Sequence, residues 1–112
     1  MGTRPQAGTL VQGTLDMLIL ARLARGAEHG FGIAEHVKRA SDEVLRVEEG
    51  SLYPALQRML IKGWVTAEWG VTDGNRRARY YRITKLGRKQ LETELSQFDR
   101  VFGAIQRVLQ TS

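Results

Sequence analysis

The apolar residues in the first quarter of the chain recur at the spacing of a helix. The pattern i, i+3, i+4, i+8 is met by Leu15, Leu18, Ile19 and Leu23. It predicts a helix over residues 14–25, with Thr14 as a candidate N-cap and Gly26 at its end. Before it, residues 1–8 are polar and contain glycine and proline, which predicts a flexible arm.

Two further helices are predicted before the middle of the chain. A turn rich in glycine at residues 28–32 precedes a second helix that runs to about Ser41. Apolar and polar residues alternate over residues 45–47, which indicates a short strand or an extended link. With Ser51 as its N-cap, a third helix runs to Gly63 and turns one face to the core. That face consists of Leu52, Leu56, Met59 and Leu60.

The period of the pattern changes after the third helix. Residues 64–69 and 79–83 are rich in aromatic and β-branched side chains, and residues 72–75 between them form a turn cluster, so a β-hairpin is predicted. A last helix begins after Thr84, a natural N-cap, and continues to about Gln110. Its apolar residues are spaced 4, 3, 4, 3 and 4 apart and form a heptad stripe: Leu91, Leu95, Phe98, Phe102, Ile105 and Leu109.

The order of these elements predicts a winged helix-turn-helix, a mainly α fold with a β-hairpin wing (α+β). We assign residues 9–83 to this DNA-binding domain and residues 84–112 to a C-terminal dimerisation helix. The apolar stripe on that helix exceeds what so small a domain needs, which indicates pairing with a second copy of the chain. A twofold dimer would place two recognition helices about 34–36 Å apart, which is one turn of DNA.

Basic residues are concentrated in one segment of the chain. The 112 residues include 17 Lys and Arg against 12 Asp and Glu, a net charge of +5. Residues 74–89 alone carry +7, through Arg76, Arg77, Arg79, Arg82, Lys85, Arg88 and Lys89. Such a cluster of one sign is typical of a phosphate-binding surface, so we expect double-stranded DNA as the partner. An ordinary polar hairpin is the alternative interpretation.

Other properties of the sequence narrow the class of protein. The chain has no cysteine, which excludes disulfides, thiol chemistry and Cys-based zinc sites. No apolar run approaches the roughly 18 residues of a membrane span and no signal peptide is recognisable, so we expect a cytoplasmic protein without a membrane partner. No nucleophile–base set, metal cluster or phosphate loop is visible, so we expect no enzyme, no catalytic residues and no cofactor.

Two groups of side chains are candidates for contact with DNA. The third helix would enter the major groove, where Gln57 suits adenine and Arg58 suits guanine, while Ser51 and the free N–H groups beside it receive a phosphate. The hairpin tip would contact the backbone or enter a minor groove. The expected contacts are Ser51, Tyr53, Pro54, Gln57 and Arg58 on the helix, and Asn75, Arg76, Arg77 and Arg79 on the wing.

The aromatic residues of the hairpin keep a structural interpretation beside a functional one. Tyr80 and Tyr81 are adjacent on a strand, so we expect one in the core and the other on the surface, where it could stack on a single-stranded base. Trp64 and Trp69 also point to opposite faces. One is expected in the core, and the other against the last helix or a ligand.

The two histidines and Asp16 are expected to have structural roles. His29 and His36 have no third ligand at metal-site spacing, so surface or capping roles are expected and no metal is assigned. Asp16 lies close to the apolar stripe of the first helix. We expect it to bond a backbone group or a neighbouring arginine, because no catalytic partner is recognisable.

Several segments resemble the PadR family of bacterial transcriptional regulators. The most specific are GSLYPAL at residues 50–56 and RRARYYR at residues 76–82, and the similarity runs over about residues 9–95. The resemblance implies a dimeric winged-helix repressor that contacts DNA through Ser51, Tyr53 and the wing residues 75–79, and dimerises through its C-terminal region. Some members bind aromatic ligands near that interface. The single C-terminal helix here contains no tryptophan, so the identity of any small-molecule effector stays open.

Two hypotheses about function follow. The first is a sequence-specific DNA-binding regulator, a homodimeric repressor that acts on a palindromic operator. The alternative is a winged-helix module for protein interaction, whose basic wing docks an acidic partner.

Overall fold

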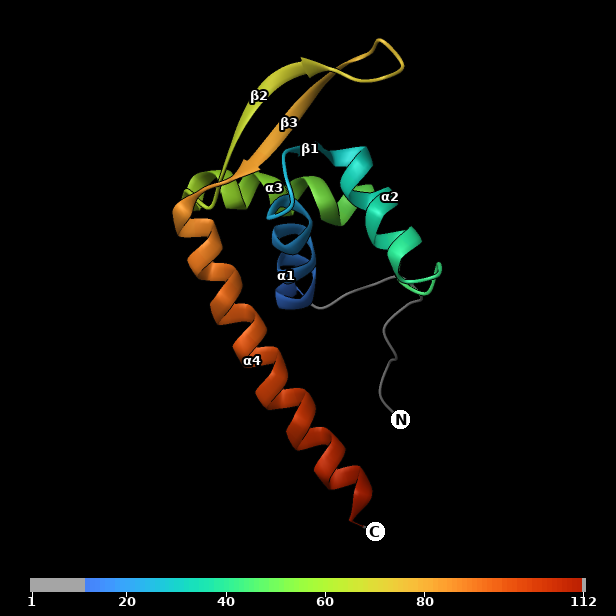
Figure 1. The fold of residues 1–112 in the computed structure, drawn as a ribbon, viewed down its shortest axis with the longest axis vertical. Coiled ribbons are helices and arrows are strands. Elements are labelled where there is room, and N and C mark those ends of the chain that lie inside the picture. The colour runs from blue at the N-terminus through green and yellow to red at the C-terminus, as the bar shows by residue number, and fades with distance from the viewer. Residues whose placement is uncertain (1–11, 112) are drawn as a thin grey trace.

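The computed structural model describes residues 12–111, which form four helices and a three-stranded sheet (Figure 1). The elements in chain order are α1 (Gln12–Leu23), β1 (Glu28–His29), α2 (Gly30–Ala40), α3 (Glu49–Lys62), β2 (Val65–Val71), β3 (Arg77–Ile83) and α4 (Lys85–Gln110). The sheet lies at one end of a helical body, and α4 extends from the body toward the other end. This is the α+β winged-helix architecture expected from the sequence. The predicted arm at residues 1–8 lies outside the described residues.

The sheet contains a strand that the sequence pattern does not predict. β3 is central and antiparallel to both neighbours, in the order β1-β3-β2. β1 lies inside the stretch predicted as a turn, and its Glu28 and His29 pair with Tyr81 and Tyr80. Two residues are too few to show an alternating pattern, so only their partners on β3 define them as a strand. The hairpin strands β2 and β3 are confirmed, each two residues longer toward the tip than predicted.

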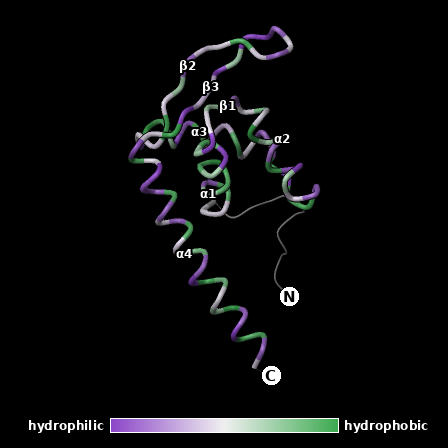
Figure 2. Tube along the Cα trace, viewed as in Figure 1, coloured by the Kyte–Doolittle hydropathy of each residue, from purple (hydrophilic) through white to green (hydrophobic). Residues whose placement is uncertain are grey.

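The core lies where three helices meet the base of the sheet. Its largest fully buried side chains are Ile19, Leu20, Leu23, Ile33, Leu52, Leu56, Met59 and Val65. The predicted core face of α3 is therefore confirmed, and Tyr81 and Ile83 on β3 close the core from the sheet side. In Figure 2 the hydrophobic segments of α1 and α3 gather at the centre of the body, whereas the tip of the hairpin is hydrophilic.

Two helices begin earlier than predicted. The extended residue before α3 is Glu48, which makes no side-chain capping bond. Ser51 therefore lies in the first turn, where its N–H donates to the Glu48 carbonyl at 2.9 Å, and the predicted N-cap at Ser51 is wrong. Thr14 likewise lies inside α1. An exposed helix start can leave its free N–H groups to water, so the cap preference of Ser and Thr does not fix the boundary.

The ends of the predicted elements agree better with the structure. α3 ends at Gly63, whose φ of 78° is the left-handed conformation typical of a helix C-terminus. α2 ends at Ala40 with Ser41 as its C-cap, close to the predicted boundary. Residues 45–48 have no regular secondary structure, so the extended link is correct and the short strand is not.

Thr84 joins α3, the base of the wing and α4. Its hydroxyl oxygen lies 2.7 Å from the carbonyl oxygen of Gly63 and 3.0 Å from that of Trp64, and it accepts the N–H of Gly87 at 3.0 Å. The predicted N-cap at Thr84 is thus confirmed. A Cβ added to Gly87 would lie 2.1 Å from the Trp64 carbonyl oxygen, so glycine is required for this close approach.

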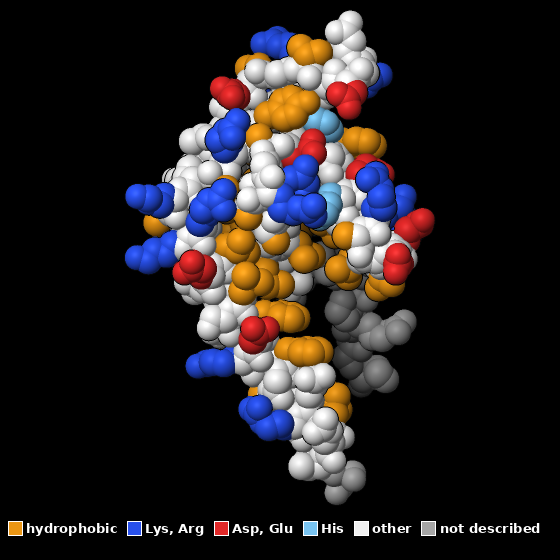
Figure 3. Space-filling view, in the orientation of Figure 1, with side chains coloured by type: hydrophobic (Ala, Val, Ile, Leu, Met, Phe, Trp, Pro, Cys, Tyr) orange, Lys and Arg blue, Asp and Glu red, His pale blue; other side chains and the backbone are white. Residues whose placement is uncertain are grey.

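α4 leaves the body after its first turns. Leu91 packs against the core, whereas the rest of the predicted stripe is exposed: Leu95, Phe98, Phe102, Ile105 and Leu109. The space-filling view shows hydrophobic side chains along the lower part of this helix (Figure 3). The molecule is therefore elongated, at 55 × 28 × 23 Å. Within residues 12–111, no helix combines the length and the apolarity needed to cross a membrane.

Candidate nucleic-acid interface

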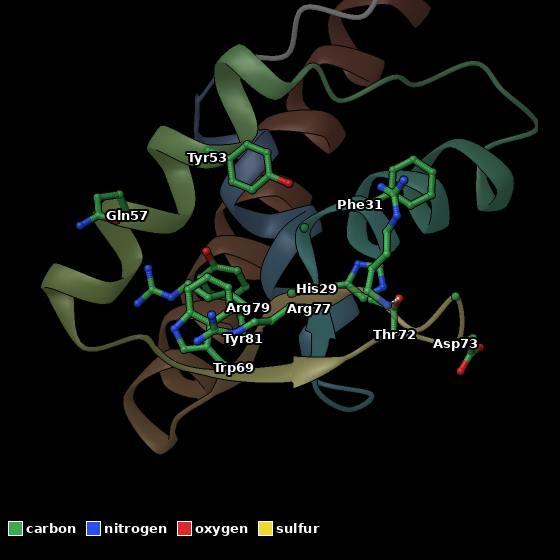
Figure 4. Close-up of a pocket in the computed structure, with 14 residues that line it drawn as sticks. His29, Phe31, Tyr53, Gln57, Trp69, Thr72, Asp73, Arg77, Arg79 and Tyr81 are labelled. Atoms are coloured by element: carbon green, nitrogen blue, oxygen red, sulfur yellow. Dashed lines mark hydrogen bonds between the residues drawn. The ribbon is translucent and has the colours of Figure 1, made fainter.

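The hairpin turns one face toward α3. Alternate residues of a strand share a face, so Arg77 and Arg79 near the tip of β3 lie on the same side as Tyr81, which is buried at its base. Trp69 on β2 pairs directly with Arg79 and belongs to that side too. We call Trp69, Arg77 and Arg79 the inner face of the wing. Figure 4 shows these side chains lying together below α3.

A groove of about 890 Å³ lies between the inner face of the wing and α3 (Figure 4). On the helix side it is lined by Tyr53 and Gln57, which are one turn apart and both exposed. Three arginines and one acid, Asp73, line it from the wing, so the groove is basic. It brings together five of the nine predicted DNA contacts: Tyr53, Gln57, Arg76, Arg77 and Arg79. Ser51 and Pro54 are exposed on α3 outside the groove lining.

The tip of the wing is a turn held by its own backbone. The N–H of Asn75 donates to the carbonyl of Thr72 at 2.9 Å, and the N–H of Arg76 donates to the Thr72 hydroxyl at 3.2 Å. Asn75 has a φ of 61°, a conformation that asparagine tolerates better than most residues. Asn75 and Arg76 therefore lie at the tip as expected, whereas Arg77 is already the first residue of β3.

Arg58 is directed to α1 and does not line the groove. Its guanidinium Nη2 donates to Oδ1 of Asp16 at 2.5 Å, and Asp16 is only 5% exposed. Because Arg58 follows Gln57, it lies about 100° further around the helix. Burial raises the pKa of the Asp16 carboxyl, and the bond to Arg58 opposes this rise. The bond confirms the expected arginine partner of Asp16. The predicted contact of Arg58 with a guanine stays a prediction, and in this structure the side chain is engaged with α1.

Tyr53 closes the end of the groove beside α2. A Cβ added to Gly30 would lie 2.7 Å from the Tyr53 hydroxyl oxygen, so the first residue of α2 and this ring are in close contact. Burial raises the pKa of the Tyr53 hydroxyl, and Glu49 adds to the effect. The hydroxyl is therefore protonated at neutral pH and available as a hydrogen-bond donor.

Cations lie over aromatic rings along the inner face of the wing. The guanidinium carbon of Arg77 is 4.4 Å from the centre of the Trp69 ring, and that of Arg79 is 6.0 Å from the Tyr81 ring. Both distances are within the range of cation–π attraction. Trp69 is the member of the tryptophan pair that lies outside the core: its side chain is 59% exposed and lines the groove. The alternation of β2 could have placed Trp69 beside these arginines, had the register been known.

The other aromatic residues of the hairpin follow the structural interpretation. Tyr81 is in the core, and Tyr80 lies on the opposite side, where its hydroxyl donates to the Val71 carbonyl at 3.3 Å. Trp64 precedes β2 and packs partly against the core, with the Lys62 ammonium 5.0 Å from its ring. One residue of each pair is thus in or against the core, as expected.

His29 positions α2 at the edge of the groove. Its Nδ1 accepts the N–H of Gly32 at 3.0 Å and caps the helix, which confirms the capping role expected for a histidine here. Glu28 is held by Arg22, which donates to Oε1 at 2.7 Å. His36 lies on α2, where desolvation and nearby arginines lower its pKa. His29 and Phe31 also line the groove. The sequence pattern does not predict this, because it gives no sign of the short strand β1 that precedes α2.

Comparison with known proteins identifies the family. Residues 19–93, more than half of the chain, match the model of the transcriptional regulator PadR-like family. An uncharacterized protein of Lysinibacillus sphaericus is 30% identical over 93 residues, which cover 82% of this chain and 84% of that protein. Transcriptional regulator Rv3488 of Mycobacterium tuberculosis is 37% identical over 73 residues, 65% of this chain and 64% of that protein.

Solved structures are similar to the whole fold as well. A transcriptional regulator from Clostridium thermocellum matches with a TM-score of 0.78 at 27% sequence identity, over 86% of this chain and 93% of that chain. The structural match agrees with the winged-helix fold described above. The chain belongs to the PadR-like family of transcriptional regulators.

Proposed function

We propose that this chain is a homodimeric repressor that binds a palindromic operator in double-stranded DNA through α3 and the wing. The observation that carries the proposal is the basic groove between Tyr53 and Gln57 on α3 and the arginines of the wing. A regulator needs a surface that combines phosphate-binding cations with side chains able to reach base edges. Both kinds of side chain meet at this groove, and the family assignment favours a regulator over an enzyme.

The two sides of the groove have different roles in this proposal. Gln57 projects from the middle of α3 and is long enough for the N6 and N7 edge of adenine in the major groove. Ser51 and Pro54 lie nearer the start of α3, where N–H groups favour a phosphate. Asn75, Arg76, Arg77 and Arg79 of the wing contact the sugar–phosphate backbone. Arg58 contributes to stability through its bond to Asp16, and its predicted contact with a guanine stays a prediction.

The proposed dimer uses the exposed stripe of α4. From Leu95 to Leu109 the stripe is 43–76% exposed within one chain, and Phe98 and Phe102 stack with ring centres 5.5 Å apart. An apolar stripe of this kind in heptad spacing favours a second copy of the same helix. We therefore retain residues 9–83 as the DNA-binding domain and residues 84–112 as the dimerisation helix. Leu91 is the exception within the stripe, because it packs against the core of its own chain.

Fluorescence anisotropy with the promoter DNA upstream of the gene tests the proposal. We expect tight binding to one site, with an affinity that falls steeply as salt rises, and weaker binding to a scrambled duplex of the same length. Selection of bound sites from random DNA should return two half-sites related by symmetry. Equal affinity for all duplexes would refute sequence-specific regulation. Binding to an acidic protein with no retention of DNA would favour the interaction module instead.

A further inference from the structure

We propose that Trp69 is a positioning residue of the DNA interface: its indole ring holds the guanidinium of Arg77 in the groove, ready for a phosphate. The inference rests on the proposed function and deepens it. Arg77 lies 4.4 Å from the centre of the indole ring, the shortest of the three cation–ring distances in the described part of the chain. Trp69 is 59% exposed, so its ring lies at the surface of the groove and not in the core.

The register of the hairpin explains why this contact forms. Trp69 pairs with Arg79, and Arg77 is its diagonal neighbour on the same face, two residues nearer the tip. Diagonal neighbours on a sheet are within reach of aromatic and long side chains. The residue paired directly with Arg77 is Val71, whose side chain is small and 64% exposed. Arg77 can therefore fold back along the strand onto the indole instead of extending into solvent.

The contact between Trp69 and Arg77 can raise the affinity for DNA even though Trp69 itself does not contact DNA. An arginine that is free in solvent loses rotamer freedom when it binds a phosphate, and that loss weakens binding. A guanidinium stacked on an aromatic face is ordered beforehand, and its N–H groups at the edge remain free to recognise a phosphate. Arg79 lies further, at 6.0 Å, over a tyrosine that is needed in the core. Trp69 is thus the residue whose removal should affect the wing arginines selectively.

The first experiment examines the stack in the free protein. In an NMR spectrum, the δ protons of Arg77 should be shifted upfield by the ring current of the indole. The shift should disappear in Trp69→Leu and persist in Trp69→Phe at reduced size. Arg82, on the outer face of the hairpin, serves as an internal control and should not respond to either substitution. Arg77 δ protons at ordinary positions in the parent would overturn the inference whatever the DNA result.

The second experiment is a double-mutant cycle on DNA affinity. We expect Trp69→Leu and Arg77→Ala each to weaken binding, the former by about threefold to fivefold. In the Arg77→Ala background Trp69→Leu should have little further effect, because there is no guanidinium left to position. Trp69→Phe should restore most of the affinity. Val71→Ala, on the same face of the same strand, and Arg82→Ala, which removes an equal charge from the other face, are the matched controls.

The outcomes separate this inference from the proposed function. If the parent binds DNA and Arg77→Ala weakens it but Trp69→Leu binds like the parent, Trp69 is not a positioning residue and the function stands. Additive effects of the two substitutions would lead to the same conclusion. If the stack is present but the parent binds no DNA, the proposed function fails and the inference fails with it. Equal thermal unfolding of the parent and Trp69→Leu excludes a folding defect as the cause of any loss.

Discussion

At the scale of the residue, the ion pair between Asp16 and Arg58 links α1 to α3. The carboxylate of Asp16 is buried. Removal of Arg58 therefore leaves the negative charge of Asp16 without this partner in a poorly solvated position. The pair therefore helps to hold α3 against the rest of the body. It thus contributes to stability and to the orientation of α3.

We expect Arg58→Ala to lower the free energy of unfolding by about 2–3 kcal/mol at neutral pH, measured by urea denaturation. The pKa of Asp16 is already raised in the folded protein, and loss of Arg58 raises it further. The penalty should therefore shrink as the pH falls through the pKa of Asp16, since a protonated carboxyl needs no cation. Arg82→Ala, at an exposed position of the wing, should change stability by less than about 0.5 kcal/mol. Unchanged stability with a relaxed base preference would return Arg58 to the DNA interface.

Gly87, in the first turn of α4, is a second residue that determines how two elements pack together. We expect Gly87→Ala to lower the melting temperature, because the new Cβ would meet the Trp64 carbonyl and force α4 away from the end of α3. Gly50→Ala is the matched control. Its Cβ would meet nothing within 4 Å, so the variant should be as stable as the parent or gain up to about 1 kcal/mol. Equal melting of Gly87→Ala and the parent would show that α4 tolerates a shift at this joint.

At the scale of the element, α3 and the wing should contribute differently to recognition. We expect Arg76→Ala to weaken binding to all duplexes and to lower the salt slope by about 1, because a phosphate contact is lost. Gln57→Ala should instead weaken the preferred site by about 1–3 kcal/mol and leave binding to other sequences little changed. Anisotropy at several salt concentrations measures both effects.

The control for the wing substitution is Arg82→Ala, which removes the same charge from the outer face of the hairpin. Its effect should be smaller than that of Arg76→Ala. Uniform behaviour of all three variants would contradict the assignment of specificity to α3 and of affinity to the wing.

Long periodic elements are predictable from this sequence, and short or boundary features are not. The apolar faces of α1, α3 and α4 repeat over several turns, so one misread position does not alter the prediction. β1 has two residues and exists only through its partners on β3. The cap preference of Ser51 predicts that α3 starts there. In the structure the N-cap residue is Glu48, which makes no side-chain capping bond. Capping preference is worth too little to fix a boundary by itself.

The candidate site is predictable as two elements and not as a groove. The basic run and the exposed face of α3 point to the two segments that line the groove. The direction of an individual side chain depends on its tertiary partners, so the sequence alone does not show that Arg58 bonds to Asp16 on α1. Trp69 is ambiguous for the same reason, because its face follows from the register with β3.

At the scale of the whole molecule, the proposed dimer depends on the exposed stripe of α4, which would bring two half-site-binding surfaces together. We expect the parent to sediment as a dimer at micromolar concentration and Phe102→Glu to sediment as a folded monomer, because a carboxylate would be buried between apolar stripes. The monomer should bind the operator much more weakly, since the two half-sites no longer act together.

Ser96→Glu provides the matched control for the dimer. It adds the same charge at an exposed position of α4 that lies on the side of the helix away from the stripe. This variant should remain dimeric in analytical ultracentrifugation. A monomeric parent would refute the proposed role of α4.

The joint at Thr84 has a mechanical consequence for such a dimer. α4 has 26 residues and is therefore about 39 Å long, and its first turn is anchored to the end of α3 and to the base of the wing. A rotation of about 10° at this anchor displaces the far end of the helix by about 7 Å. Conversely, a small slide between two paired helices becomes a tilt of both DNA-reading surfaces. In the proposed dimer, the angle between α4 and the rest of its chain would therefore set the half-site spacing that the dimer accepts.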